Sequence, residues 1–363
     1  MEKASKFVGK AHDFILNERH VQKIDALIDG KPYFPELIEI FPSNICNHHC
    51  TFCISAESNS AKSFIDTEVF YNTIREAAQG GVSKIRLCGG GEPLLHKSIV
   101  NFITFASQHI ESVSLITNGS LMTDAMREAI VNHCNDVRFS IDAGNAEVYA
   151  KMHGTSHKSF DKTLHHISKL IKSKGKAITP LVELSFVATS ENIDSLPQFI
   201  EIATTLQPNS VNITTNTLAP LKSQIAMYKK VKAILNNHTG SNVPISANIS
   251  HSDAFEETSE PCPAFLLYGV VTSKGTYYSS CHHVERNINS LGTIHRSYTL
   301  KTLLSDPKVI QKQLKYAFGK DVKTEKLYKH PYNEKLLELM VNSKQTLDKV
   351  TTWMSKNITL KID

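Results

Sequence analysis

The 363-residue sequence lacks the features that mark several special classes of protein. It has one Trp, only 29 Gly and Pro together, and no apolar run near the roughly 18 residues that a membrane-spanning helix needs. Its first residues, Met1–Lys6, are too polar for a secretory signal. We therefore exclude a collagen-like or low-complexity chain and expect a globular, cytoplasmic protein with no membrane partner.

Cysteine is also scarce, with seven residues, and three of them (Cys46, Cys50 and Cys53) lie within eight positions. An odd count with such crowding favours a metal or cluster site over disulfides. Arginine is missing from residues 301–363, although these residues hold 13 Lys against 7 acidic residues. Lysine alone gives no bidentate contacts to phosphates or bases, so we interpret this charge as a solvated helix face and expect no nucleic-acid partner.

Short apolar runs alternate with amphipathic ones along most of the chain. The runs predict six strands, at 37–41, 84–88, 113–117, 137–141, 182–187 and 211–215. The amphipathic stretches predict crossover helices, at 67–79, 123–134, 159–172 and 192–206. This alternation predicts a parallel sheet with right-handed crossovers.

The pattern changes near residue 250. Two β-like runs, 265–272 and 276–281, flank Ser273-Lys274-Gly275 and predict a β-hairpin. Helices are expected at 301–317 and 333–354. We therefore predict an N-terminal helix in residues 1–36, an α/β domain in residues 37–250 and a hairpin with helices in residues 251–363.

Unusual residues follow four of the predicted strands. They are the Cys triplet, Gly89-Gly90-Gly91-Glu92-Pro93, Thr117-Asn118-Gly119 and Ser140-Ile141-Asp142. The carboxyl ends of parallel strands lie along one edge of a sheet, where such folds place their active sites. The sequence therefore predicts a functional site at this edge.

The Cys triplet has the spacing C-x-x-x-C-x-x-C. Three thiolates can hold a [4Fe–4S] cluster and leave one iron open, whereas structural zinc ordinarily takes four ligands. Zinc remains an alternative, because His48 or His49 could supply the fourth ligand.

With Phe52 just before the last Cys and Gly90-Gly91-Glu92 about 36 residues later, residues 37–215 resemble the radical S-adenosylmethionine (radical SAM) superfamily. The resemblance implies a partial (β/α)6 TIM-like barrel and two cofactors, a [4Fe–4S] cluster and S-adenosylmethionine. It also implies that the cluster is bound by Cys46, Cys50 and Cys53. The cosubstrate-binding residues that it implies are Gly90, Gly91, Glu92, Asn118, Ser140 and Asp142.

The physical reasons for these roles differ. Glycines at 90 and 91 would let the backbone approach the methionine moiety, and Glu92 would pair with its ammonium group. Ser140 and Asp142 would accept hydrogen bonds from the ribose. One departure concerns residues 151–154, Lys-Met-His-Gly, where relatives often carry Arg-x-Arg-Gly. If such an Arg contacts the carboxylate of S-adenosylmethionine, Lys151 or His153 would have to substitute for it here, or that contact is lost.

The predicted hairpin resembles half of the auxiliary-cluster domain of SPASM and twitch radical enzymes, with Cys262 and Cys281 on either side. No Cys follows Cys281, so a four-Cys auxiliary cluster cannot form from this chain. Three interpretations remain open: a degenerate hairpin that lines the substrate pocket, an unusual cluster completed by His282, His283 or His295, and a catalytic Cys281 that donates hydrogen to a substrate radical.

The resemblance implies an enzyme that reductively cleaves S-adenosylmethionine to a 5′-deoxyadenosyl radical and abstracts hydrogen from a substrate. We expect a small polar metabolite, such as a sugar, aminocyclitol or nucleotide-sugar, and a reducing partner such as flavodoxin or ferredoxin. The alternatives are modification of a ribosomal peptide and, in a different class, a non-catalytic iron–sulfur electron carrier. The sequence leaves the net reaction open.

Overall fold

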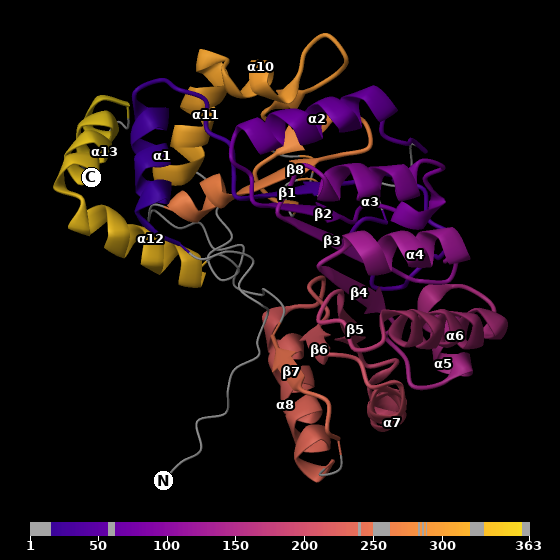
Figure 1. Ribbon diagram of the computed structural model, residues 1–363. Coiled ribbons are helices and arrows are strands. Elements are labelled where there is room, and N and C mark those ends of the chain that lie inside the picture. The colour runs from indigo at the N-terminus through magenta and orange to yellow at the C-terminus, as the bar shows by residue number, and fades with distance from the viewer. Residues whose placement is uncertain are drawn as a thin grey trace. The chain divides into compact units, whose positions relative to one another are not determined.

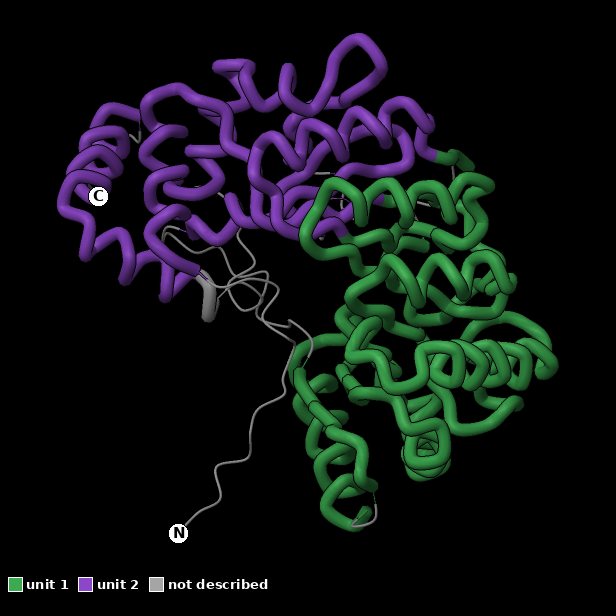
Figure 2. Tube along the Cα trace, in the orientation of Figure 1, with its two compact units in different colours: residues 1–13, 41–64, 86–252 green, residues 14–40, 65–85, 253–363 purple. Residues whose placement is uncertain are grey.

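The computed structural model describes residues 16–56, 62–238, 241–249, 262–281, 284, 287, 289–319 and 330–357. The chain divides into two compact units, drawn in different colours in Figure 2. Unit 1 contains the described residues of 41–64 and 86–252, and unit 2 those of 14–40, 65–85 and 253–363. The division falls inside strand β2 (Lys84–Leu87).

Unit 1 is built from parallel strands that alternate with helices. Its strands pair in chain order and are β3 (Ser112–Thr117), β4 (Asp136–Ser140), β5 (Leu181–Ala188), β6 (Ser210–Thr215) and β7 (Ile245–Asn248). Its α-helices are α3 (Ile99–Ser107), α4 (Asp124–His133), α5 (Ala146–His153), α6 (His157–Lys174), α7 (Leu196–Leu206) and α8 (Leu221–Asn237). Figure 1 shows α3, α4 and α6 one after another along the same side of the strands.

The sequence accounts for these elements locally. Along β5, every second residue from Val182 to Ala188 is buried, as the two-residue period of a strand requires. Thr123 and Asn145 begin α4 and α5 by accepting hydrogen bonds from the backbone N–H groups of Met126 and Val148. The strands therefore end, and the helices begin, on the edge that carries the polar loops.

Unit 2 combines helices with a small mixed set of strands. Its elements are α1 (Glu18–Ile28), β1 (Leu37–Ile40), α2 (Thr67–Gln79), β8 (Tyr268–Val271), β9 (Thr276–Tyr278), β10 (Gly292–Thr293), α10 (Leu300–Leu304), α11 (Pro307–Phe318), α12 (His330–Asn342) and α13 (Lys344–Asn357). Strand β8 pairs parallel with β1 and antiparallel with β9, so residues 268–278 form a hairpin. Figure 1 shows α1 beside α11 and α13, and these helices share one apolar core.

A buried ion-pair network in unit 2 fixes α1. The Glu36 carboxylate is fully buried and accepts hydrogen bonds from Arg19 and from Lys23 (2.6 Å) on α1. Burial alone would raise the pKa of Glu36, but hydrogen bonds from His20 and Lys23 hold it at about 2. This carboxylate therefore tethers α1 to the segment that precedes β1.

The structure confirms the predicted fold class and places all six predicted strands within a residue or so of their expected ends. The two predicted C-terminal helices were wrong, because each is two helices. The first breaks at Pro307, where Asp306 caps α11 through Lys308 N, and the second breaks at Ser343. None of the described helices is long and apolar enough to cross a membrane.

The domain limits expected from the sequence remain a prediction. The two compact units have different limits from those domains. The units separate at residues 252 and 253, close to the expected boundary near 250. However, residues 14–40 and 65–85 belong to the same unit as the C-terminal part of the chain. This grouping was not predicted from the sequence, nor were β7, α3, α5 and α8.

Candidate active site

The Cys loop, which we define as residues 43–56, lies against the Gly-Gly-Glu segment. The N–H of Gly91 donates to the carbonyl of Ser43 (3.0 Å), and the N–H of Glu92 donates to the carbonyl of Ile45 (2.9 Å). A Cβ added to Gly91 would lie 2.2 Å from the Ile45 carbonyl oxygen. Gly91 is therefore needed for the close approach of two segments of the chain, a role that differs from the predicted contact with the methionine moiety.

The three thiols of the loop are half-buried, and none forms a disulfide. Burial, helped by the nearby charges of Glu92 and Cys53 and opposed by backbone hydrogen bonds from His48 and Asn47, raises the pKa of Cys46 to about 11. Burial also raises the pKa of Cys50, with contributions from Asp142, Cys53 and Cys46. The thiols thus lie close enough to influence one another, and Cys46 Sγ accepts a hydrogen bond from the N–H of His48 (3.4 Å).

Glu92 is buried, with 2% of its surface exposed, and its side chain links two strand ends. Its carboxylate accepts hydrogen bonds from Thr117 Oγ1 (2.6 Å) and from the N–H groups of Asn118 (2.8 Å) and Leu94 (3.0 Å). Burial raises its pKa and these three bonds oppose the rise. Pairing of Glu92 with the ammonium group of the cosubstrate remains a prediction, and the bonds present join the β2 and β3 ends.

Asn118 faces the Cys loop. Its Nδ2 donates to Asn47 Oδ1 (3.0 Å), and its Oδ1 accepts from the N–H (3.0 Å) and hydroxyl (2.8 Å) of Ser120. Asn47 in turn donates to the Ser120 hydroxyl (2.8 Å). Sequence reasoning missed Asn47, and it placed Thr117 at a strand end without predicting its bond to Glu92, since no signal in one sequence pairs residues 71 or 25 positions apart.

Ser140 and Asp142 differ in exposure. The Ser140 side chain is half-buried at the end of β4. Asp142 has no exposed surface, and its Oδ1 accepts from the N–H of Val187 (2.7 Å). Burial raises the pKa of Asp142 to about 7. A ribose contact remains a prediction for both residues, and only Ser140 has surface with which to make one.

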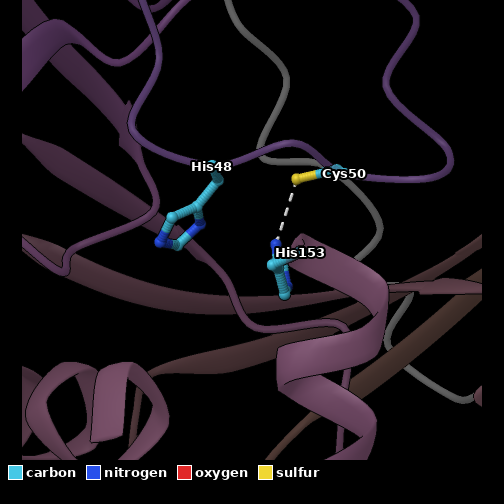
Figure 3. A group of neighbouring side chains, drawn as sticks. All are labelled: His48, Cys50 and His153. Carbon is cyan, nitrogen blue, oxygen red and sulfur yellow. Dashed lines mark hydrogen bonds between the residues drawn. The ribbon is translucent and has the colours of Figure 1, made fainter. Parts of the chain in front are cut away.

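Among the described residues, one group of His, Cys, Asp and Glu side chains has ligand atoms within 4.8 Å of one another: His48, Cys50 and His153 (Figure 3). His153 Nδ1 lies 3.1 Å from Cys50 Sγ, and its Nε2 lies 3.0 Å from the Ile141 carbonyl oxygen. His48 is also buried, and neither of its ring nitrogens has a hydrogen-bond partner among the described residues. Burial lowers the pKa of both histidines to about 4.

The segment that departs from the Arg-x-Arg-Gly pattern contributes one residue to this group. Lys151 is exposed and pairs with Glu191 (3.2 Å). His153 is the one of the two that faces the Cys loop. Gly154 ends α5 with φ +56°, and a Cβ there would lie 2.8 Å from the His49 carbonyl oxygen.

Comparison with known proteins assigns this arrangement to a family. Residues 40–203 match the model of the radical SAM superfamily. The chain therefore carries a radical SAM domain in these residues. Members of the superfamily use a [4Fe–4S] cluster and S-adenosylmethionine.

Curated relatives match only part of this radical SAM chain. A probable GTP 3′,8-cyclase of Methanopyrus kandleri is 30% identical over 156 residues, which are 43% of this chain and 48% of that protein. A GTP 3′,8-cyclase of Clostridium perfringens is 26% identical over 208 residues, or 56% and 60%. The chain thus spans about half the length of the curated relatives it matches.

Solved structures share the radical SAM fold at low identity. Streptococcus suis SuiB bound to precursor peptide SuiA has a TM-score of 0.63 and 14% identity, with 81% of this chain and 69% of that chain covered. Native anSMEcpe with bound AdoMet (S-adenosylmethionine) has a TM-score of 0.56 and 16% identity, with 87% and 99% covered. These likenesses show the fold alone.

The residues present fit the superfamily's cluster. The three thiols are a suitable donor set for the cluster. The loop that carries them packs so closely on Gly91 that a Cβ added at Gly91 would displace the loop backbone. The N–H of His48 already points at Cys46 Sγ, as backbone N–H groups do around cluster sulfurs.

Outside the radical SAM domain, Cys262 and Cys281 belong to unit 2. Cys262 is buried in the apolar core that also contains Phe265 and Leu314, and Cys281 is half-buried. Neither forms a disulfide. His282 and His283 lie outside the described residues, so an auxiliary cluster and a hydrogen-donating Cys281 both remain predictions.

Proposed function

We propose that this chain is a radical SAM enzyme whose cluster is bound by Cys46, Cys50 and Cys53. When bound, the cluster supplies the electron that cleaves S-adenosylmethionine, and the resulting radical abstracts hydrogen from a substrate. The observation that carries the proposal is the Cys loop itself, which is fixed to the Gly-Gly-Glu segment by two backbone hydrogen bonds within the superfamily match.

The surrounding residues support a site built around the loop. Glu92 and Asn118 join the loop to the end of β3, and His153 joins it to the end of β4. We propose that Gly90 and the half-buried Ser140 contact the cosubstrate. We also propose that Glu92 Oε2, which accepts one hydrogen bond within the chain, accepts a second from the ammonium group of the cosubstrate. The buried carboxyl of Asp142 is proposed as a positioning group.

For the substrate we propose a small polar metabolite of the sugar or nucleotide type. The curated relatives that match are named for a reaction of GTP, a nucleotide, and this supports a small molecule. Peptide modification rests on the SuiB–SuiA complex, whose likeness concerns the fold. A reducing partner such as flavodoxin or ferredoxin would deliver the electron.

The test is anaerobic reconstitution of the chain with iron and sulfide, followed by iron counting and an assay for 5′-deoxyadenosine after reduction with S-adenosylmethionine present. We expect about 4 iron atoms per chain and cleavage of the cosubstrate. Cys50→Ala should lose both. Cys134→Ala is the matched control, because Cys134 is buried at the end of α4 and should leave both unchanged.

Full iron content and cleavage in Cys50→Ala would refute the proposal. A cluster that never yields 5′-deoxyadenosine, with or without added substrate, would favour the electron carrier instead. The substrate class is tested by adding GTP, sugar nucleotides or short peptides and measuring which one raises 5′-deoxyadenosine formation above the background.

A further inference from the structure

Two histidines and one cysteine of unit 1 converge from two different segments of the chain (Figure 3). His48 and Cys50 belong to the Cys loop, and His153 is the last residue of α5. One ligand atom from each lies within 4.8 Å of those of the other two, and the Nδ1 of His153 is 3.1 Å from the sulfur of Cys50. The group takes one of the three thiols of the loop and leaves out Cys46 and Cys53. Two nitrogens and one sulfur thus form a donor set of their own.

The contacts of His153 orient its ring as a metal ligand. A carbonyl oxygen only accepts hydrogen bonds, so the 3.0 Å contact with Ile141 places a hydrogen on Nε2. In the neutral ring Nδ1 then carries a lone pair, which accepts the hydrogen of the Cys50 thiol. Metal-binding histidines show this pattern, with one nitrogen on the metal and the N–H of the other on a backbone carbonyl or a carboxylate. The thiol hydrogen lies where a metal ion would bridge the two side chains.

The His48 ring is buried, and neither of its nitrogens has a hydrogen-bond partner among the described residues. The residue is 4% exposed, and its ring lies 5.3 Å from that of His153, centroid to centroid. Buried polar side chains nearly always have a partner, so an exception calls for an explanation, and an ion is one. A metal ion held by Cys50 and His153 would give one of these nitrogens its partner.

The donor set and its spacing suit zinc. Zinc binds imidazole nitrogen at about 2.0–2.1 Å and thiolate sulfur at about 2.3 Å in a tetrahedron, so its ligand atoms lie about 3.3–3.6 Å apart. Ligand atoms that already lie within 4.8 Å of one another reach this spacing with shifts of about 1 Å. Three protein ligands leave the fourth position to water. A [4Fe–4S] cluster, in contrast, would use the thiols of the loop and no imidazole.

We propose that His48, Cys50 and His153 bind a zinc ion in the cluster-free chain, with water as the fourth ligand. On binding, the S–H bond of Cys50 breaks, its proton passes to the solvent, and a Zn–S bond forms with no change of oxidation state. Because Cys50 is also a proposed cluster ligand, zinc and the cluster exclude each other. Only this exclusion rests on the proposed function, since the zinc site itself follows from the three side chains.

The experiment is a zinc titration of the full chain, freed of iron under anaerobic conditions, in competition with a chromogenic chelator. We expect the wild type to bind one zinc ion per chain. His48→Phe and His153→Phe each keep a ring and remove its nitrogens. Each should weaken zinc binding about 100-fold or more, because even the residues that orient metal ligands contribute about 10–100-fold. Cys53→Ala is the matched control, which should lose the cluster and bind zinc as the wild type does.

X-ray absorption at the zinc edge counts the ligands in the wild-type chain and decides the matter even if a variant fails to fold. We expect one sulfur and two imidazole nitrogens. Two or three sulfurs would overturn the inference, as would a wild type that binds no zinc or a His48→Phe variant that binds it equally well. Zinc binding lost in Cys53→Ala would also overturn it, because the thiols would then form the site. Iron uptake by the reconstituted wild type is measured separately, so either proposal can fail without the other.

Discussion

Gly91→Ala tests whether the second glycine of the Gly-Gly-Glu segment serves the Cys loop or the cosubstrate. The added Cβ would lie 2.2 Å from the Ile45 carbonyl oxygen and 2.6 Å from the carbonyl carbons of Asn44 and Ile45. These atoms are backbone, so no side chain can rotate away. Ordinary contact would require the loop to retreat by about 1 Å.

The expected cost follows from the contacts that such a shift would break. Overpacking costs about 1–3 kcal/mol, and the hydrogen bonds from Gly91 to Ser43 and from Glu92 to Ile45 contribute about 1 kcal/mol each. The native loop conformation should therefore lose about 3–5 kcal/mol of stability. Since each 1.4 kcal/mol is a factor of ten, its population falls by about 100-fold or more.

The assay is iron per chain after anaerobic reconstitution, together with thermal unfolding. We expect Gly91→Ala to bind far less iron than the wild type. Gly175→Ala is the control: Gly175 ends α6 with φ +58°, and a Cβ there would meet nothing within 4 Å. It should cost about 1–3 kcal/mol of stability through backbone strain alone, because its ψ of −128° lies outside the left-handed helical region, and it should keep its iron. Full iron content in Gly91→Ala, with cosubstrate binding lost, would refute this reasoning and restore the role predicted from the sequence.

Two further substitutions test the buried carboxylates. Because the pKa of Glu36 is held at about 2, its carboxylate stabilises the fold above about pH 4.5, and this stabilisation is lost as the pH falls towards 2. Glu36→Gln should remove this pH dependence and cost about 1–3 kcal/mol of unfolding free energy at pH 7. Urea unfolding at pH 7 and pH 3.5 measures the cost and the pH dependence. If the free energy of unfolding falls equally in the variant and the wild type between these pH values, the prediction is contradicted. Thr117→Val should cost about 1–3 kcal/mol, because it leaves the buried Glu92 carboxylate without its 2.6 Å hydroxyl donor. Thr117→Ser keeps the hydroxyl, and equal stability of the two variants in urea would show that the bond is unimportant.

The sequence predicted the fold well where one period governs a segment. The apolar run at 182–187 predicted β5, and Leu181–Ala188 alternates buried and partly exposed positions as a strand should. The break at Pro307 could have been predicted, since Asp306 followed by proline is a helix start. Helix α5 is different, because it has eight residues and a weak apolar face, and its place is set by packing against α6 and the Cys loop.

The site was predictable in its residue types more than in their roles. The spacing of the Cys triplet identified the loop, and strand ends placed Glu92 and Asn118 near it. Their partners could not be predicted, because the bond between Asn118 and Asn47 joins positions 71 residues apart. Asp142 illustrates the limit, since its place after β4 suggests an exposed acceptor and only the fold shows its carboxyl turned inward to Val187.

The Cys loop is held from two sides by the chain's own backbone. Gly91 and Glu92 bond to its first residues, and on the other side the N–H of Thr51 donates to the Met152 carbonyl (2.9 Å) at the end of α5. Fixing the backbone of a free loop costs about 1–2 kcal/mol per residue, so a loop already ordered by these bonds binds a cluster without bearing that cost at the time of binding. Motif residues that hold the loop in this way, such as Gly91 and Glu92, therefore contribute to cluster affinity. Among the residues proposed to contact the cosubstrate, Ser140 keeps exposed surface with which to do so.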